Sequence, residues 1–201
     1  MMKHTILWDF DGVILNSMSV RDLGFRMIFE KYPKSKVEEL IQYHRINGGL
    51  SRYVKIRYFY EEILKLSITE KLVTDYAQKF SEIMKVKLID TQNLIEETVV
   101  FIKKNHSKYN FHIVSGSDQV ELRYLCQKLD ISQFFITIEG SPTPKNLLVK
   151  NLLNHYQYKK SKVCLIGDSL NDYEAAASNN IDFIAFNAPS LIKYNTIDPL
   201  F

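Results

Sequence analysis

Two aspartates, Asp9 and Asp11, stand two residues apart near the start of the chain. They follow a short apolar run, Thr5 to Trp8, which is typical of a buried strand. In extended backbone, side chains two residues apart share a face, so we expect both carboxylates to project together and Phe10 to point away. Two carboxylates this close repel each other, and a divalent cation or a shared proton relieves the repulsion. Gly12 lets the chain turn sharply behind them.

A second carboxylate pair, Asp168 and Asp172, follows another predicted strand, Val163 to Ile166. Both pairs therefore fall at carboxyl ends of strands, where open parallel sheets bind ligands. Magnesium prefers oxygen ligands and retained waters, which suits Asp9, Asp168 and the backbone carbonyl of Asp11, with Asp172 helping directly or through water. The simpler alternative makes Asp168 a helix cap and Asp172 a surface residue. The common position of the pairs favours a Mg²⁺ site.

Two further segments have the chemistry to bind phosphate. Ser115 ends the predicted strand Phe111 to Val114 and precedes Gly116, so its hydroxyl and nearby amides could hold phosphate oxygens. Lys145 follows Ser-Pro-Thr-Pro, a rigid approach that could fix its ammonium group near the same anion. Taken singly, Ser115 could be a helix N-cap and Lys145 a solvated lysine. Their placement at predicted strand ends indicates one crevice that collects them with the carboxylates.

Size and composition set the class of protein. A chain of 201 residues can hold one core-sized domain and a small accessory unit. Hydrophobic residues make up 46% and charged residues 24%, as in folded globular proteins. The excess of 26 basic over 23 acidic residues is too small to indicate nucleic acid, although it fits a small anionic ligand. No signal-type or membrane-spanning apolar run is present, so we expect a cytoplasmic protein without membrane partners, monomeric or a small homo-oligomer.

Strand-like apolar runs alternate with helical patterns, which predicts an α/β fold with a parallel sheet. The helical patterns include Gln119 to Leu129 and a helix with Pro144 in its first turn. The two cysteines, Cys126 and Cys164, lie in apolar segments and are expected to be free, buried thiols. The predicted strands are Thr5 to Trp8, Phe111 to Val114, Phe135 to Ile138, Val163 to Ile166 and Phe183 to Phe186.

Residues 17–88 interrupt this alternation with four predicted helices and no strand. The first should bury Val20, Leu23 and Met27, and a capping box from Ser67 to Glu70 should open the last. We therefore expect a helical cap inserted into a catalytic core made of 1–16 and 89–201. Its borders should be two hinges, at 15–17 and 88–93, the second rich in polar turn residues.

The motifs resemble those of the haloacid dehalogenase superfamily, and the resemblance covers nearly the whole chain. It implies a Rossmann-like core with an inserted cap, in which Asp9 is the nucleophile and Asp11 the acid/base. It also implies that Ser115 and Lys145 hold the transferring phosphoryl group and that Asp168 ligates magnesium. The helical insertion resembles the cap of the phosphoglycolate phosphatase and β-phosphoglucomutase-like branch. The four motifs are Asp9-x-Asp11, Ser115, Lys145 and Gly167-Asp168-Ser169-x-x-Asp172.

The predicted activity is hydrolysis of a small phosphorylated metabolite. A cation and Lys145 would neutralise the phosphate monoester so that Asp9 can attack in line and form an aspartyl-phosphate. Asp11 would first protonate the departing alcohol and then activate water. A sugar phosphomutase using the same intermediate is the main alternative, followed by a non-enzymatic binding module. A dehalogenase fits less well, because carbon–halogen cleavage needs neither a proton donor nor magnesium.

Substrate choice should lie in the cap. Residues 47–52, with the order Gly-x-Ser-Arg, resemble the specificity loop of the phosphoglucomutase-like branch. That resemblance implies that Arg52 grips a non-reacting anionic end of the substrate, by a charge-assisted contact. The alternative is an exposed arginine in the first turn of a helix.

Overall fold

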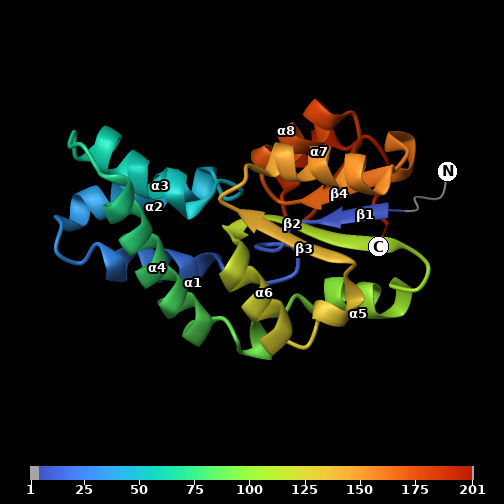
Figure 1. The fold of residues 1–201 in the computed structure, drawn as a ribbon, viewed down its shortest axis with the longest axis horizontal. Coiled ribbons are helices and arrows are strands. Elements are labelled where there is room, and N and C mark those ends of the chain that lie inside the picture. Colours follow the sequence, from blue (N-terminus) through green and yellow to red (C-terminus); the bar gives the residue numbers. More distant parts are fainter. Residues whose placement is uncertain (1–4, 201) are drawn as a thin grey trace.

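A five-stranded parallel sheet forms the centre of the protein, whose computed structural model describes residues 5–200 (Figure 1). The strand order β3-β2-β1-β4-β5 places β1 in the middle, so the chain leaves the sheet at its centre when it reaches Asp9. The expected α/β class is confirmed. The strands are β1 (Thr5–Trp8), β2 (Asn110–Asp118), β3 (Thr137–Ser141), β4 (Val163–Gly167) and β5 (Asp182–Ala185).

Helices cover both faces of the sheet. On one face lie α7 (Lys145–Tyr156) and α8 (Leu170–Asn179), and on the other α5 (Glu96–Asn105) and α6 (Gln119–Lys128) (Figure 1). Alternate residues of β1 pack into the two resulting cores: Leu7 into the first, Ile6 and Trp8 into the second. A strand buried on both faces must be apolar throughout, which is why β1 and β4 read as continuous apolar runs.

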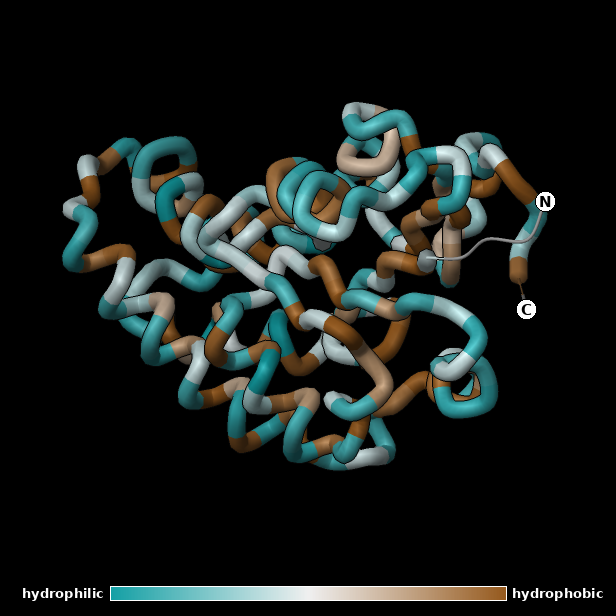
Figure 2. The backbone as a smooth tube through the Cα atoms, turned by 45° about the vertical axis from the view of Figure 1, so that its right-hand side comes forward, coloured by the Kyte–Doolittle hydropathy of each residue, from teal (hydrophilic) through white to brown (hydrophobic). Residues whose placement is uncertain are grey.

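A second group of helices lies beside the carboxyl ends of the strands (Figure 1). Bands of hydrophilic and hydrophobic residues alternate along these helices, as expected for amphipathic helices that pack together (Figure 2). Aromatic side chains fill their interior, including the tilted pairs Phe29–Phe59 and Phe25–Phe80. The group comprises α1 (Met18–Ile28), α2 (Lys34–Ile46), α3 (Arg52–Tyr58), which continues as a π-helical turn (Phe59–Ile63), and α4 (Glu70–Lys87).

The expected helical insertion is thus present, and its treatment as a separate cap over 17–88 stays a prediction. The two segments that connect it to the sheet lie side by side. Asn16 N donates to Asn93 O at 2.7 Å, and Ile95 N donates to Ile14 O at 2.9 Å. Within residues 5–200, no helix is long and apolar enough to cross a membrane. Cys126 and Cys164 are buried and form no disulfide, as expected.

The predicted buried face of α1 is wrong. Leu23 and Met27 are 40% and 42% exposed, whereas the helix buries Arg21, Asp22 and Phe25. The helix borders the polar site at the strand ends, so ion pairs of its charged side chains replace part of the apolar packing that the pattern predicted.

Several element boundaries also differ from expectation, and β2 continues to Asp118 instead of ending at Val114. The third strand begins at Thr137 rather than at Phe135. A 3₁₀ turn covers Ser132–Phe134, and Phe135 packs into the core before the strand starts. This edge strand carries polar residues, since it is not buried as completely as the central ones. Thr69, not Ser67, caps α4, accepting from Leu72 N at 3.3 Å. Pro144 is the N-cap of α7 rather than a first-turn residue.

Candidate active site

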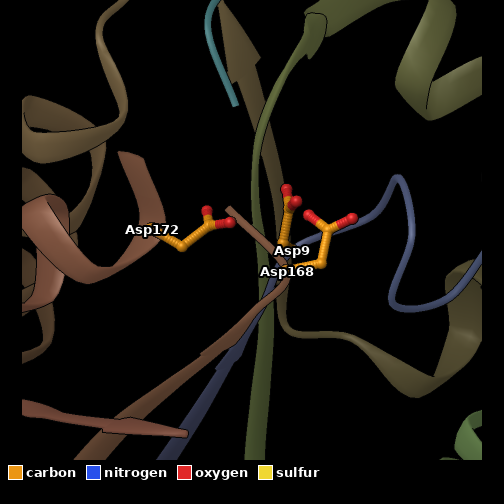
Figure 3. Close-up of side chains that lie close together, drawn as sticks. All are labelled: Asp9, Asp168 and Asp172. Carbon is orange, nitrogen blue, oxygen red and sulfur yellow. The ribbon is translucent and has the colours of Figure 1, made fainter. Parts of the chain in front are cut away.

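Asp9 and Asp168 emerge from the two central strands and lie next to each other (Figure 3). Asp9 N donates to Ile166 O at 2.9 Å, which extends the pairing of β1 with β4 by one step. Asp172 points toward both from α8, and oxygens of the three carboxylates lie within 4.8 Å of one another. The turn after Asp9 needs Gly12, with φ of 78°, because a Cβ there would lie 1.8 Å from Asp168 Oδ2.

Asp172 is a fully buried residue of the site, so the surface alternative is wrong. Its Oδ2 accepts hydrogen bonds from the backbone N (3.0 Å) and Oγ (2.6 Å) of Ser169, which closes a capping box at the start of α8. This leaves Oδ1 to face Lys145. The helix start therefore fixes the direction of a carboxylate that belongs to the site.

Lys145 is also buried rather than solvated. Its Nζ donates to Asp9 Oδ1 at 2.7 Å and to Asp172 Oδ1. Burial would lower the pKa of this amine, but the ion pairs with Asp172 and Asp9 outweigh burial and raise the pKa above its ordinary value. Lys145 is therefore a fixed positive charge within the carboxylate cluster.

Negative charge in the cluster exceeds what Lys145 balances. Burial, followed by repulsion from Asp172, raises the pKa of Asp9 to about 7. Burial and repulsion from Asp9 and then Asp172 raise the pKa of Asp168 to about 8. Three converging carboxylates carry more negative charge than one ammonium group offsets, and a divalent cation would neutralise the excess. Their oxygen atoms are ligands that suit Mg²⁺.

Asp11 lies in a different environment. Arg21 Nε donates to its Oδ1 at 2.7 Å, Ser117 Oγ donates to its Oδ2 at 2.5 Å, and Ser17 Oγ donates to Oδ1. Burial acts to raise the pKa of Asp11, but the charge of Arg21 and the hydrogen bonds from Ser117 and Ser17 outweigh it, so the pKa lies below its ordinary value. The two aspartates of the first motif thus have pKa values shifted in opposite directions.

Ser115 and Gly116 lie where β2 reaches the site. Ser115 is buried, and its Oγ accepts from Ser117 N at 3.1 Å, which holds this stretch of backbone in shape. A Cβ on Gly116 would lie 2.2 Å from the carbonyl oxygen of Gly49, in the predicted specificity loop. Gly116 therefore allows the loop to approach the core closely.

Arg52 is 4% exposed, so the solvent-exposed alternative for this residue is wrong. Its Nη1 lies 2.6 Å from Glu121 Oε2 of α6 and donates to Ser81 Oγ of α4 at 2.6 Å. The guanidinium carbon also lies 4.7 Å from the centre of the Phe80 ring. Arg52 thereby connects the helical insertion with the core near Asp11.

Several residues of the site were missed by sequence reasoning. Arg21 and Glu121 are both buried and ion-paired at 3.1 Å, although they lie 100 residues apart in the chain. No local pattern connects them, because the contact depends on how α1 meets α6. The sequence did offer a signal for Ser17 and Arg21, because both follow the first motif at the start of a helix. His44 and Lys55 are buried beside them.

Comparison with known proteins shows which family has this arrangement of residues. A family model for haloacid dehalogenase-like hydrolases matches residues 6–186. No curated protein matches the chain in a sequence comparison. A solved structure of similar fold is a variant of CbbY from Rhodobacter sphaeroides in complex with xylulose-1,5-bisphosphate, with TM-score 0.75, 14% identity, and coverage of 94% of this chain and 89% of that chain.

Two further solved structures share the fold. YfnB from Bacillus subtilis, bound to magnesium and described as revealing interdomain movement, has TM-score 0.71, 17% identity, and coverage of 96% of this chain and 92% of that chain. A predicted phosphoglycolate phosphatase from Haemophilus somnus has TM-score 0.69, 14% identity, and coverage of 92% and 85%. The family match spans both carboxylate pairs, Ser115 and Lys145, and the chain belongs to the haloacid dehalogenase-like hydrolase family.

Proposed function

We propose that this hydrolase is a Mg²⁺-dependent phosphatase of a small phosphorylated metabolite, acting through an aspartyl-phosphate on Asp9. The observation that carries the proposal is the contact of Lys145 with Asp9 and Asp172, beside Asp168. A lysine and a cation-binding carboxylate cluster around one nucleophile suit a doubly charged phosphoryl group better than an uncharged substrate.

Asp9, Asp168 and Asp172 are the carboxylates that would hold Mg²⁺, together with the backbone carbonyl of Asp11. The raised pKa values of Asp9 and Asp168 support this assignment, because a bound cation would remove the repulsion that contributes to them. When bound, Mg²⁺ supplies positive charge that offsets the charge of the phosphoryl oxygens. The magnesium in YfnB is consistent with this proposal.

In the first displacement, a carboxylate oxygen of Asp9 forms a bond to phosphorus while the bond from phosphorus to the alcohol oxygen breaks. The bonding electrons go to the alcohol oxygen, which receives a proton from Asp11. Lys145, Ser115 and the backbone of Gly116 hold the phosphoryl oxygens during the transfer. In the second displacement, Asp11 takes a proton from water, the water oxygen bonds to phosphorus, and the bond to Asp9 breaks.

The environment of Asp11 bears on this division of labour. Its pairing with Arg21 favours the carboxylate, which is the form that activates water. Proton donation in the first displacement requires that this pairing weaken when the ester binds. Arg21 lies on α1 of the helical insertion, so a movement of the cap would change the contact. The interdomain movement described for YfnB supports such a cap motion.

Arg52 is proposed to determine the substrate. It lies close to Asp11, and its Nη2 is buried without a hydrogen-bond partner in the described structure, so one donor remains for the leaving group. The cytoplasm remains the predicted location.

The proposal is tested by steady-state hydrolysis of a generic aryl phosphate with Mg²⁺ and with excess chelator. Wild type should be active only with Mg²⁺, and Asp9→Asn should be inactive. Asp198→Asn, which changes an exposed carboxylate, is the matched control and should retain wild-type activity. Full activity in excess chelator, or in the Asp9→Asn variant, would contradict the proposed Mg²⁺-dependent phosphatase activity. Release of inorganic phosphate, rather than transfer to an added sugar phosphate, separates hydrolysis from the mutase reaction.

A further inference from the structure

A small cavity lies between the helical insertion and Asp11. Its volume is about 20 Å³, enough for a single water molecule. The charged and polar side chains of the insertion that line it are Arg21, His44, Lys55 and Arg52. Because it borders the proposed proton donor, it is placed to receive one small polar group of the ester's alcohol portion, and we refer to it as the leaving-group cavity.

Two carboxylates already pair with the two arginines of this cavity. Arg21 contacts Asp11 at 2.7 Å and Glu121 at 3.1 Å, and Arg52 contacts Glu121 at 2.6 Å. Glu121 is fully buried, so solvent does not screen its charge. The arginines therefore offer little net positive charge to a substrate.

The neighbouring groups add little positive charge. Lys55 Nζ donates to Gly48 O at 3.0 Å, and burial, followed by the charge of Arg21, lowers the pKa of Lys55 to about 7. On the core side, Asp118 accepts a hydrogen bond from Tyr53 of α3 at 2.8 Å. A second anion brought into the cavity would approach Asp11, which lines it, and Glu121, which pairs with its arginines, and like charges at close range are disfavoured.

The polar atoms left for a ligand suit an uncharged group. Both ring nitrogens of His44 and Nη2 of Arg52 are buried and have no hydrogen-bond partner among the described residues; His44 Nε2 lies 3.9 Å from the buried Asp22 Oδ1, beyond hydrogen-bond distance. Burial, followed by the charge of Lys55, lowers the pKa of His44 to about 2, so the ring is neutral and offers one donor and one acceptor. A hydroxyl group can accept from Arg52 and donate to His44, whereas a carboxylate can only accept.

We infer that Glu121 is a specificity-determining residue, which neutralises the leaving-group cavity so that the enzyme selects a small leaving group bearing a hydroxyl over one bearing a second anion. This inference rests on the proposed phosphatase activity. It narrows the substrate class to phosphate monoesters of small polyhydroxy compounds with a single anionic group. It also replaces the anionic partner that the sequence predicted for Arg52 with a neutral one.

The test uses three esters with two-carbon leaving groups, together with the aryl phosphate as a general reference. Hydroxyethyl phosphate carries a hydroxyl, phosphoglycolate a carboxylate and ethyl phosphate neither. Wild type with Mg²⁺ should show a kcat/KM for hydroxyethyl phosphate at least about ten-fold above that for phosphoglycolate. Glu121→Gln, which keeps the shape and removes the charge, should shift this ratio at least about ten-fold toward phosphoglycolate, mainly through KM.

Two further variants complete the design. Glu38→Gln removes an exposed carboxylate that pairs with Arg26 on the insertion, and it should leave the ratio unchanged. His44→Phe keeps a ring but removes both ring nitrogens. It should lower the ratio of hydroxyethyl phosphate to ethyl phosphate by about ten-fold, because a polar site discriminates between a hydroxyl and its absence. If circular dichroism shows that Glu121→Gln does not fold, the inference is tested by two other results. These are the wild-type preference between hydroxyethyl phosphate and phosphoglycolate, and the effect of His44→Phe.

Wild type that prefers phosphoglycolate would overturn the inference, because Glu121 would then stand in for an anion of the substrate. An unchanged ratio in folded Glu121→Gln would overturn it as well, as would equal losses on both esters in His44→Phe. In each of these cases, activity on the aryl phosphate would still support the proposed phosphatase function. Wild type inactive on all four esters would contradict the phosphatase itself.

Discussion

At the scale of single residues, Lys145 offsets part of the negative charge of the site through its contacts with Asp9 and Asp172. The carboxylates approach one another because the sheet and α8 force them together, and the lysine makes that approach tolerable. The same ammonium group is positioned for a phosphoryl oxygen. One side chain thus serves both stability and the proposed chemistry.

Lys145→Met should therefore reduce kcat/KM for an aryl phosphate by about 10²- to 10³-fold, the usual loss for one positioned electrostatic donor. Lys150→Met, an exposed position on the same helix, should behave like wild type. Steady-state kinetics of the two variants make the comparison. Similar losses in both would mean that α7, rather than the ammonium group, is responsible.

A second residue-scale prediction concerns His112, which is buried in β2 between Thr137 Oγ1 (2.8 Å) and Tyr158 Oη (3.1 Å). Burial lowers its pKa from 6.5 to about 4. Below pH 6.5 the unfolded chain binds a proton that the folded protein does not, so this residue reduces stability as the pH falls from 6.5 toward 4.

His112→Gln should accordingly flatten the loss of unfolding free energy between pH 6 and pH 5 by about 1 kcal/mol per pH unit. Urea unfolding of wild type and variant at both pH values measures the difference, and titration of the site carboxylates cancels because both proteins share them. His106→Gln, at an exposed position, is the control. An identical pH dependence in all three proteins would show that His112 does not titrate as described.

At the scale of elements, the loop before α3 decides how closely the helical insertion approaches the core. A Cβ on Gly49 would lie 2.6 Å from Ser169 Oγ and 2.9 Å from Asn171 Cβ. A Cβ on the neighbouring Gly48 would meet nothing closer than Met18 Cε at 3.7 Å. Two adjacent glycines therefore provide a matched pair, since only one of them lacks space for a methyl group.

Gly49→Ala should lower kcat/KM about ten-fold or more, because the loop would be held away from the site and small displacements of positioning groups are costly in rate. Gly48→Ala should stay within about two-fold of wild type, since its methyl group meets only ordinary contacts. Kinetics with hydroxyethyl phosphate compares them. Equal behaviour of the two variants would contradict the proposed importance of loop closure.

The strands that sequence predicted well, β1 and β4, are buried on both faces, so their composition is dictated by the core. Prediction was weaker where an element meets the polar site or the edge of the sheet. The face of α1 was misassigned because Arg21 and Asp22 are buried through ion pairs, which hydrophobic periodicity does not register. The start of β3 was misplaced because this edge strand carries polar residues and is less completely buried than the central strands.

At the scale of the whole molecule, the site is divided between two parts of the chain. The core supplies the carboxylates, Lys145 and Glu121, and the insertion supplies Arg21 and Arg52. Sequence reasoning found the carboxylates and Lys145, because those residues follow predicted strands in a fixed order, but it missed Glu121. It could not find the pairing of Glu121 with the arginines, since nothing local specifies which faces of α1, α3 and α6 meet.

The two parts are connected by adjacent segments, joined by the hydrogen bonds between Asn16 and Asn93 and between Ile14 and Ile95. Paired connections of this kind suit rotation of the insertion as one unit. Such rotation would carry Arg21 away from Asp11 and Arg52 away from Glu121 together. Rotation of the insertion is therefore expected to weaken both contacts in one event.

The central claim is that Asp9 becomes phosphorylated, and acid-quenched turnover followed by peptide mass spectrometry tests it most directly. With Mg²⁺ and an aryl phosphate, wild type should carry a phosphoryl group on the peptide that contains Asp9. Asp11→Asn should accumulate more of it, because water is no longer activated while the aryl leaving group needs little protonation. Asp9→Asn should carry none. A phosphoryl group on any other residue, or turnover by Asp9→Asn at the wild-type rate, would contradict the account.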